Sequence, residues 1–216
     1  MTCELRRGER RVRFITRLQG EIKVATSPQA GRAPASVGSG NVQSKLSGRQ
    51  WVSRFPTGTS ISDLAPVFRR KVEAFLAAIA AANGRVRISA TYRPRERAYL
   101  MHYAAAIANG SITAASVPAF AGVDIEWDHG STEKTRAAAR EMASAYGIVF
   151  PPALVSRHTE RNAVDMTISN VKNKKIKTAS GTEVLIQRDS DLHAVGASYG
   201  VKKLLSDPPH WSDDGS

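Results

Sequence analysis

Apolar residues recur every three or four positions between residues 60 and 84. These residues are Leu64, Val67, Phe68, Val72, Phe75, Leu76 and Ile79. This spacing places their side chains on one face of a helix, so it predicts an amphipathic helix in this stretch. Ser62 is the expected N-cap residue, and Gly84 lies where the helix would stop.

The helical pattern returns in two later stretches. Residues 94–110 predict a second helix, which a proline opens and a glycine closes. Residues 131–147 predict a third helix with Ser131 as its N-cap residue and a glycine at its end.

Short alternating stretches predict strands. Residues 85–90 alternate in the manner of a half-buried strand, and residues 122–130 alternate acidic and apolar side chains, which suits an exposed or site-facing strand. Further on, the pattern predicts strands at residues 162–169, 175–180 and 182–187, a short helix at 191–200, and a proline-stiffened turn into a last strand at 207–212. Helices come first and an antiparallel sheet second, which predicts the α+β fold class.

Composition separates the first fifty residues from the rest of the chain. Residues 27–50 are rich in Ser, Gly, Pro and Ala, which cannot build a hydrophobic core. Residues 1–50 carry ten Lys or Arg against three Asp or Glu, whereas the remainder carries 21 against 16. We therefore expect a basic, flexible arm and linker over residues 1–50 and one globular domain over residues 51–216.

The net charge of +12 suits a polyanionic partner such as nucleic acid, an anionic membrane or a bacterial wall. A specific nucleic-acid partner is the weaker interpretation, because much of the excess charge lies in the arm and no basic face with interleaved aromatic residues is visible. No apolar run is long enough to predict a transmembrane segment. The first residues lack the apolar core of a signal peptide, so we expect release by another route or a different natural start.

The stretch from residue 156 to residue 169 carries the first candidate chemistry. Asp165 interrupts an alternating apolar strand, and His158 lies one short turn before it. The chain has a single cysteine, Cys3, so a metal ion would be held by histidines and carboxylates. His210, fixed by two preceding prolines, is the candidate third ligand, and Asp207 is a nearby proton acceptor. The same residues also suit packed histidines and an aspartate that caps a turn or pairs with Arg, and spacing alone does not choose between these interpretations.

Three motifs add a resemblance to a known family. The segments "SATYRP", "SRHTERNAVD" and "DPPHW" resemble, in this order, motifs of the zinc D-Ala-D-Ala peptidase family. The resemblance covers residues 89–211. It implies a small α+β fold in which helices pack on an antiparallel sheet with one zinc site, similar to the Hedgehog signalling domain. It also implies hydrolysis of peptide bonds in peptidoglycan stem peptides, by a D-Ala-D-Ala carboxypeptidase or by an endolysin-like endopeptidase that cuts L-alanyl-D-glutamate bonds.

The resemblance assigns roles to individual residues. It implies that His158, Asp165 and His210 bind one Zn²⁺ ion. Asp207 would be the general base, at a place where many members have Glu. Arg93 would stabilise the developing oxyanion with its fork of donors. A surface Arg that follows a strand is the alternative interpretation of Arg93.

Other residues are candidates for substrate binding. The resemblance implies that Ser156 positions the peptide. We assign Tyr92 to substrate binding as well. Asp124 and Glu126 could form a wall of the cleft that meets an ammonium group of the stem peptide, although a solvated face is the stronger interpretation of these acids. The family's turn glycine falls at Arg161, which predicts a differently shaped loop between the ligands.

We therefore expect a monomeric zinc peptidase that acts on the cell wall, in the periplasm or outside the cell. The alternative is a zinc-binding module of Hedgehog-like fold without catalysis, which binds the wall or another partner.

Overall fold

The computed structural model describes residues 45–148 and 151–216. Most of the expected basic arm, residues 1–44, lies outside the described residues. Within the described part, folded structure begins before the expected Trp51. Leu46 pairs with Glu126 in an isolated parallel bridge, and the backbone N–H of Ser47 donates to the carbonyl of Glu126 at 2.7 Å.

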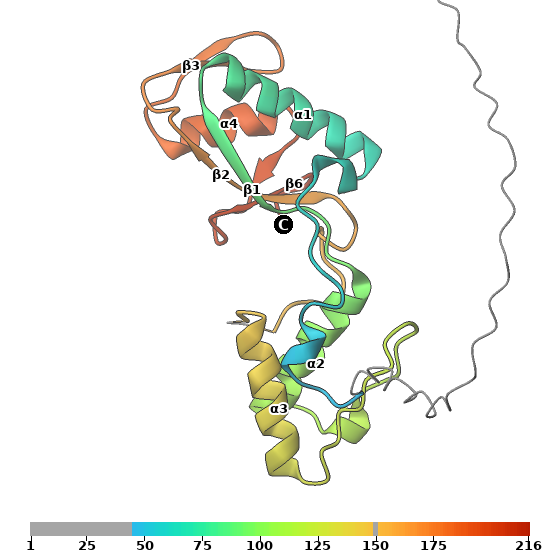
Figure 1. Ribbon diagram of the computed structural model, residues 1–216. Coiled ribbons are helices and arrows are strands. Elements are labelled where there is room, and N and C mark those ends of the chain that lie inside the picture. Colours follow the sequence, from blue (N-terminus) through green and yellow to red (C-terminus); the bar gives the residue numbers. More distant parts are fainter. Residues whose placement is uncertain (1–44, 149–150) are drawn as a thin grey trace, which may run out of the picture. The chain divides into compact units, whose positions relative to one another are not determined.

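The described residues contain both helices and antiparallel strands, which confirms the α+β class (Figure 1). The helices are α1 (Pro66–Ala81), α2 (Arg95–Asn109), α3 (Thr132–Ala145) and α4 (Asp189–Ser198), with the short 3₁₀ helices η1 (Arg49–Trp51), η2 (Ile61–Asp63) and η3 (Ala114–Ser116). The strands are β1 (Arg85–Ala90), β2 (Ala163–Ser169), β3 (Lys175–Lys177), β4 (Glu183–Leu185), β5 (Lys202–Lys203) and β6 (His210–Ser212). One antiparallel sheet has the order β1-β2-β6-β5, and β3 and β4 form a separate hairpin.

The prediction that Ser62 is the N-cap residue of the first helix is wrong, because α1 begins after Ala65. Ser60 and Asp63 form a capping box around η2, so the polar groups of this segment serve a short 3₁₀ turn instead. The α-helix begins at Pro66, after Ala65 in an extended conformation with ψ 138°. A proline disfavours the helical conformation at the residue before it, and it fits the first helical position well.

Residues 122–130 do not form the predicted strand. Only the isolated bridges of Val123 with Phe120 and of Glu126 with Leu46 occur there. The side chain of Glu126 accepts from the N–H of Asp128 at 3.1 Å, and Asp128 accepts from the N–H of Gly130 at 2.9 Å. Acidic side chains that bond nearby backbone groups compete with a strand ladder, which explains the irregular conformation.

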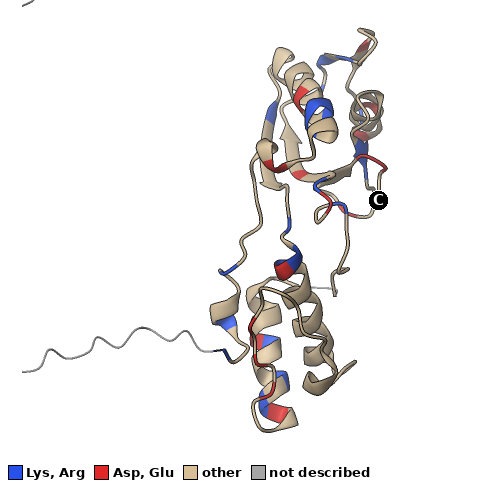
Figure 2. Ribbon diagram, turned by 90° about the vertical axis from the view of Figure 1, so that its right-hand side faces the viewer, with Lys and Arg blue, Asp and Glu red and all other residues tan. Residues whose placement is uncertain are grey.

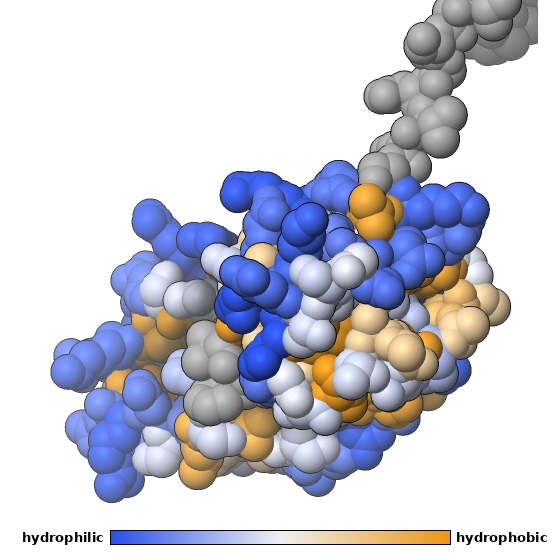
Figure 3. All heavy atoms as spheres, turned by 90° about the horizontal axis from the view of Figure 1, so that it is seen from below, coloured by the Kyte–Doolittle hydropathy of each residue, from blue (hydrophilic) through white to orange (hydrophobic). Residues whose placement is uncertain are grey.

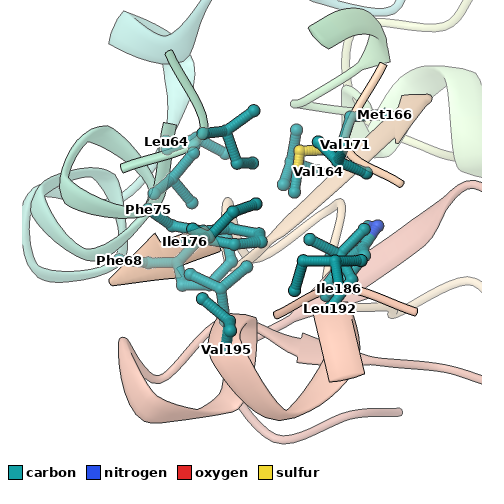
Figure 4. Packing of buried hydrophobic residues seen from close by; sticks show 14 residues of the cluster. Leu64, Phe68, Phe75, Val164, Met166, Val171, Ile176, Ile186, Leu192 and Val195 are labelled. Carbon is teal, nitrogen blue, oxygen red and sulfur yellow. The ribbon is translucent and has the colours of Figure 1, made fainter. Parts of the chain in front are cut away.

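Two clusters of buried apolar residues stabilise the described chain. In the first, α1, α4 and the four-stranded sheet pack together through residues such as Phe68, Phe75, Val164 and Val195 (Figure 4). In the second, α2 and α3 pack against each other and against η1 (Figure 1). Of the predicted helices, α1 therefore covers the sheet, whereas α2 and α3 build a core of their own.

The surface is mixed in charge and mostly hydrophilic. Segments with Lys or Arg and segments with Asp or Glu are both scattered over the described residues (Figure 2), and hydrophilic side chains predominate on the face shown in Figure 3. The large apolar side chains that are exposed are Leu46, Val67, Leu154, Val155, Leu185 and Leu205. None of the helices in the described part has the length and apolar character needed to cross a membrane.

The four-stranded sheet fixes the register that matters for the site. Asp165 on β2 lies directly opposite His210 on β6. On the other side of β2, the pairing with β1 shifts between Ile88 and Ala90, so that Ala90 faces Asp165. A β-bulge of this kind redirects the chain, and here it ends β1 beside the segment that leads to Arg93.

Gly196 offers a test of the packing between α4 and the sheet. A Cβ atom at this position would lie 2.6 Å from the Trp211 ring and 2.8 Å from the carbonyl oxygen of Val201. Alanine normally favours a helix over glycine by about 1 kcal/mol. Here we expect Gly196→Ala to lower the free energy of unfolding by about 1–3 kcal/mol, as overpacking does.

Urea denaturation of the two proteins measures this difference. Ala197→Gly, at the exposed neighbouring position, is the control and should follow ordinary helix propensity with a loss of about 1 kcal/mol. A more stable Gly196→Ala protein would contradict the close approach of α4 to Trp211.

Candidate metal centre

Three predicted ligands meet at one point. His158 lies in the turn before β2, Asp165 lies on β2, and His210 begins β6. His158 Nε2 is 3.0 Å from Asp165 Oδ1 and 3.2 Å from His210 Nδ1, and His210 Nδ1 is 3.2 Å from Asp165 Oδ1. Both imidazoles are buried and the carboxylate is half-buried. The structure therefore brings together one atom from each of the three residues.

The outer nitrogen of each ring faces a backbone carbonyl. His158 Nδ1 lies 2.7 Å from the oxygen of Thr91, and His210 Nε2 lies 3.1 Å from the backbone oxygen of Ser216. A carbonyl oxygen only accepts hydrogen bonds, so these two nitrogens carry the ring protons. In the neutral rings, His158 Nε2 and His210 Nδ1 then present lone pairs to the centre.

The Asp165 carboxylate adds negative charge to this group. Burial alone would raise the pKa of Asp165, but its contacts with His158 and His210 outweigh burial and hold the pKa below its usual range. An anion and two nitrogen lone pairs within 3.2 Å of one another repel unless a positive charge lies among them. An additional ring proton or a metal ion supplies that charge.

The spacing of the three atoms fits a metal ion. A tetrahedral ion with ligand bonds of about 2.0–2.1 Å holds its ligand atoms about 3.3–3.4 Å apart. The observed separations of 3.0–3.2 Å are close to this value. Two imidazole nitrogens and one carboxylate oxygen suit borderline divalent metals. The group could therefore bind a metal ion, and with three ligands from the described residues it would leave a fourth position for another ligand.

Arg93 and Asp207 lie in the cavity that contains the three ligands, which has a volume of about 590 Å³. The backbone N–H of Arg93 donates to the carbonyl of His158 at 3.2 Å. Burial lowers the pKa of the Arg93 guanidinium, and the negative charges of Asp165 and Asp207 oppose that shift. Arg93 is therefore a half-buried cation beside the metal ligands rather than a surface arginine.

The turn that carries Asp207 and His210 is held by Lys203. Its ammonium group donates to the carbonyl oxygens of Leu204 and Asp207, and to that of His210 at 3.0 Å. The N–H of His210 also donates to the carbonyl of Asp207 at 3.0 Å. The side chain of Asp207 stays exposed to the cavity, while its backbone is fixed next to the ligand His210.

Ser156 also lines this cavity. Its hydroxyl oxygen is buried and has no hydrogen-bond partner among the described residues. The hydroxyl of Ser156 is therefore an unsatisfied polar group beside the cavity, which is costly in free energy.

Three predicted substrate-binding residues lie elsewhere. The ring of Tyr92 is covered by the guanidinium of Arg161, 3.7 Å from the ring centroid. Asp124 pairs with Lys45 at 2.6 Å, and Glu126 bonds the local backbone. Both acids line a different cavity, next to the core of α2 and α3, and none of the three lines the cavity of the metal ligands.

Sequence patterns gave no indication of Thr91, Lys203 or Ser216. Thr91 and Ser216 act through backbone oxygens, which any residue carries. Lys203 acts on three carbonyl groups that only the folded turn brings together. These contributions depend on folded geometry, so no residue type could reveal them.

Arg161 has a left-handed backbone with φ 64°, the conformation that glycine adopts most easily. The turn therefore follows a backbone path that glycine adopts easily, with an arginine at this position. The carbonyl of Arg161 accepts from the N–H of Ala65 at 2.9 Å, and its Nη1 donates to the carbonyl of Asp63 at 2.8 Å. Together with the stacking on Tyr92, these contacts offset the strain of the left-handed conformation.

Comparison with models of known protein families found no match. Comparisons with curated proteins and with solved structures found no significant similarity either. The geometry of the site and the sequence motifs therefore carry the functional argument.

Metal binding is directly testable. We expect the metal-free full chain to bind one divalent ion, and Asp165→Asn to weaken binding at least about 100-fold, because an amide oxygen supplies no negative charge. Isothermal titration calorimetry with Zn²⁺ or Co²⁺ measures the affinity. Asp189→Asn, an exposed acid in the first turn of α4, is the matched control and should bind like the wild type. Equal affinity of the two variants would contradict the site.

Arg161 allows the strain in the turn to be measured. Arg161→Gly and Arg161→Ala both lose the guanidinium contacts, but only Ala keeps the left-handed strain of roughly 1–2 kcal/mol. We expect the Gly variant to be more stable than the Ala variant by about 1 kcal/mol in urea denaturation. At Arg87, an exposed position on strand β1, the same pair should show the reverse order. An Ala variant at residue 161 that is as stable as the Gly variant, or more stable, would rule out strain at Arg161.

Proposed function

We propose that the protein is a zinc-dependent peptidase that hydrolyses peptide bonds in peptidoglycan stem peptides. The observation that carries this proposal is the convergence of His158, Asp165 and His210 within 3.2 Å, with Arg93 and Asp207 in the same cavity. Structural zinc sites are usually closed by four protein ligands, whereas catalytic sites have three and keep one position for water or substrate. The three-ligand set supports catalysis for this reason.

The donor set and its surroundings support zinc. Two imidazole nitrogens with one carboxylate oxygen are common ligands of Zn²⁺ in hydrolases. The backbone oxygens of Thr91 and Ser216 lie beside the outer ring nitrogens, as the second sphere of zinc histidines generally does. When bound, zinc would act as a Lewis acid that lowers the pKa of a water molecule and polarises the scissile carbonyl.

Asp207 is the proposed general base. Its carboxylate is exposed in the cavity three residues before the ligand His210, and it belongs to none of the three ligand contacts. A carboxylate in this position accepts a proton from the attacking water and returns it to the leaving amine. The hydrogen bond from the Lys203 ammonium group to the carbonyl oxygen of Asp207 limits the movement of the Asp207 backbone. This helps to keep the geometry of proton transfer fixed.

Arg93 is the proposed electrostatic partner of the reacting carbonyl. Partial burial keeps water away from its guanidinium and strengthens the interaction with a developing negative charge. Its fixed charge and planar donors suit an oxyanion better than an ammonium group would.

The substrate class rests on the motifs. The three segments that resemble the zinc D-Ala-D-Ala peptidase family contain Arg93, the three ligands and Asp207, and the fold places all five in one cavity. Both activities of the family remain candidates, D-Ala-D-Ala carboxypeptidase and endolysin-like endopeptidase. Either substrate places the reaction at the cell wall, in the periplasm or outside the cell, and the basic arm would favour an anionic wall.

Digestion of purified peptidoglycan tests the proposal. We expect the zinc-loaded protein to release new fragments, a chelator to stop their release, and added zinc to restore it. Mass spectrometry identifies the bond, because free D-Ala indicates a carboxypeptidase and larger stem fragments indicate an endopeptidase. Asp207→Asn should reduce the rate about 10²–10⁴-fold, the usual contribution of a general base, with little change in zinc affinity.

The Asp189→Asn variant is again the control and should keep the wild-type rate. An Asp207→Asn protein with the full rate would contradict the assigned base. Zinc binding without any new fragment would favour the alternative, a zinc-binding module without catalysis.

A further inference from the structure

Residues 212–216 form a tight turn beside the metal ligands. The carboxylate of Asp214 organises this turn through one oxygen, Oδ1, which accepts from Ser212 Oγ at 3.2 Å, from the N–H of Ser216 at 3.0 Å and from Ser216 Oγ at 2.8 Å. The N–H of Gly215 donates to Ser212 Oγ at 2.8 Å. Asp214 therefore determines where the backbone of Ser216 lies.

Arg157 attaches this turn to the loop that carries His158. Its guanidinium donates to the second oxygen of Asp214, and to Glu160 at 2.9 Å. The N–H of Asp213 also donates to the carbonyl of Asn162 at 3.1 Å. The turn is thus bound to residues 157 and 162, on either side of His158, which lie more than fifty residues away in sequence.

Ser216 connects the Arg157–Asp214 pair to His210, the third candidate ligand. The backbone oxygen of Ser216 lies 3.1 Å from His210 Nε2 and holds the proton on that nitrogen, which leaves Nδ1 free to face Asp165. His158 has a comparable partner in Thr91, which is fully buried. Ser216 is exposed and belongs to no helix or strand, so its position depends on Asp214 and Arg157.

We propose that Arg157 and Asp214 are positioning residues of the metal centre, which orient His210 through the backbone oxygen of Ser216. This inference rests on the proposed zinc site. An imidazole without its outer partner can place its proton on either nitrogen or turn its ring, and only one of these arrangements presents Nδ1 to the ion. The pair acts on the ligand and does not touch the substrate.

Asp213 provides a matched control on the same turn. Its carboxylate lies 3.5 Å from Arg157 Nε, a weaker contact than that of Asp214, and it makes no hydrogen bond to Ser216 among the described contacts. Removal of either carboxylate takes one negative charge from the same place. Only the removal of Asp214 releases Ser216.

The test compares the wild type, Asp214→Ala and Asp213→Ala as full chains. Zinc affinity is measured by competition with a chromophoric chelator. We expect Asp214→Ala to bind zinc at least about 10-fold more weakly, as outer partners of zinc histidines usually contribute 10–100-fold. Asp213→Ala should stay within about threefold of the wild type. The proton position on His210 is read from the ¹⁵N shifts of the metal-free proteins.

In the wild type and in Asp213→Ala, His210 should carry its proton on Nε2, and in Asp214→Ala both tautomers should appear. Asp214→Asn keeps an oxygen for Ser216 but loses the charge pair with Arg157. Its zinc affinity should therefore lie between that of the wild type and that of Asp214→Ala. If Asp214→Ala does not fold, Asp214→Asn takes its place in the comparison. Equal zinc affinity and equal tautomers in all folded variants would overturn the inference while the zinc site stands. A wild type that binds no zinc would instead overturn the proposed function.

Discussion

The site depends on three atoms that face one another, and in neutral rings whose outer nitrogens carry the protons all three are hydrogen-bond acceptors. His158 Nε2, His210 Nδ1 and Asp165 Oδ1 lie 3.0–3.2 Å apart, and the outer nitrogens of both rings are occupied by carbonyl oxygens. In neutral rings this arrangement is repulsive, and a cation converts the repulsion into binding. Much of the surrounding structure serves to maintain this convergence.

The sheet explains how a carboxylate can interrupt an apolar strand. Successive side chains of a strand point to opposite faces. Val164 and Met166 therefore enter the core under α1 and α4, and Asp165 between them points to the other face, where it meets His210 across the β2–β6 pair. A slip of one residue would exchange these faces, so the apolar core that fixes the register of β2 also fixes the place of the metal ligand.

The sequence allowed the regular elements and the ligand set to be predicted, because both depend on residue types at set spacings. The helices α2 and α3 lie within the predicted stretches and end beside Gly110 and Gly147, both with positive φ. The predictions of an N-cap at Ser62 and of a strand over residues 122–130 were wrong, because polar side chains there form hydrogen bonds in other local structures. Ser62 lies inside a 3₁₀ turn that Ser60 caps, and the side chains of Glu126 and Asp128 accept hydrogen bonds from nearby backbone N–H groups.

Three of the candidate substrate-binding residues lie outside the cavity of the candidate ligands for a related reason. The expectation that Asp124 and Glu126 lie at the cleft depends on their charge and on an alternating strand over residues 122–130, and this strand does not form. Tyr92 is adjacent in sequence to Arg93, yet its ring stacks under Arg161 while Arg93 enters the cavity. Neighbours at the end of a strand point in different directions, so a motif that locates one of them does not locate the other.

The metal centre and the proposed base are supported in different ways. The ligands are buried or half-buried, two of them lie on paired strands, and both imidazoles are held by backbone oxygens. Asp207 lies on an exposed turn, whose backbone is held by the ammonium group of Lys203. Under the proposed function, substitutions in this turn could change proton transfer while the ion stays bound. Substitutions in the strands would remove the ion together with the activity, so the two halves of the chemistry are separable by mutation.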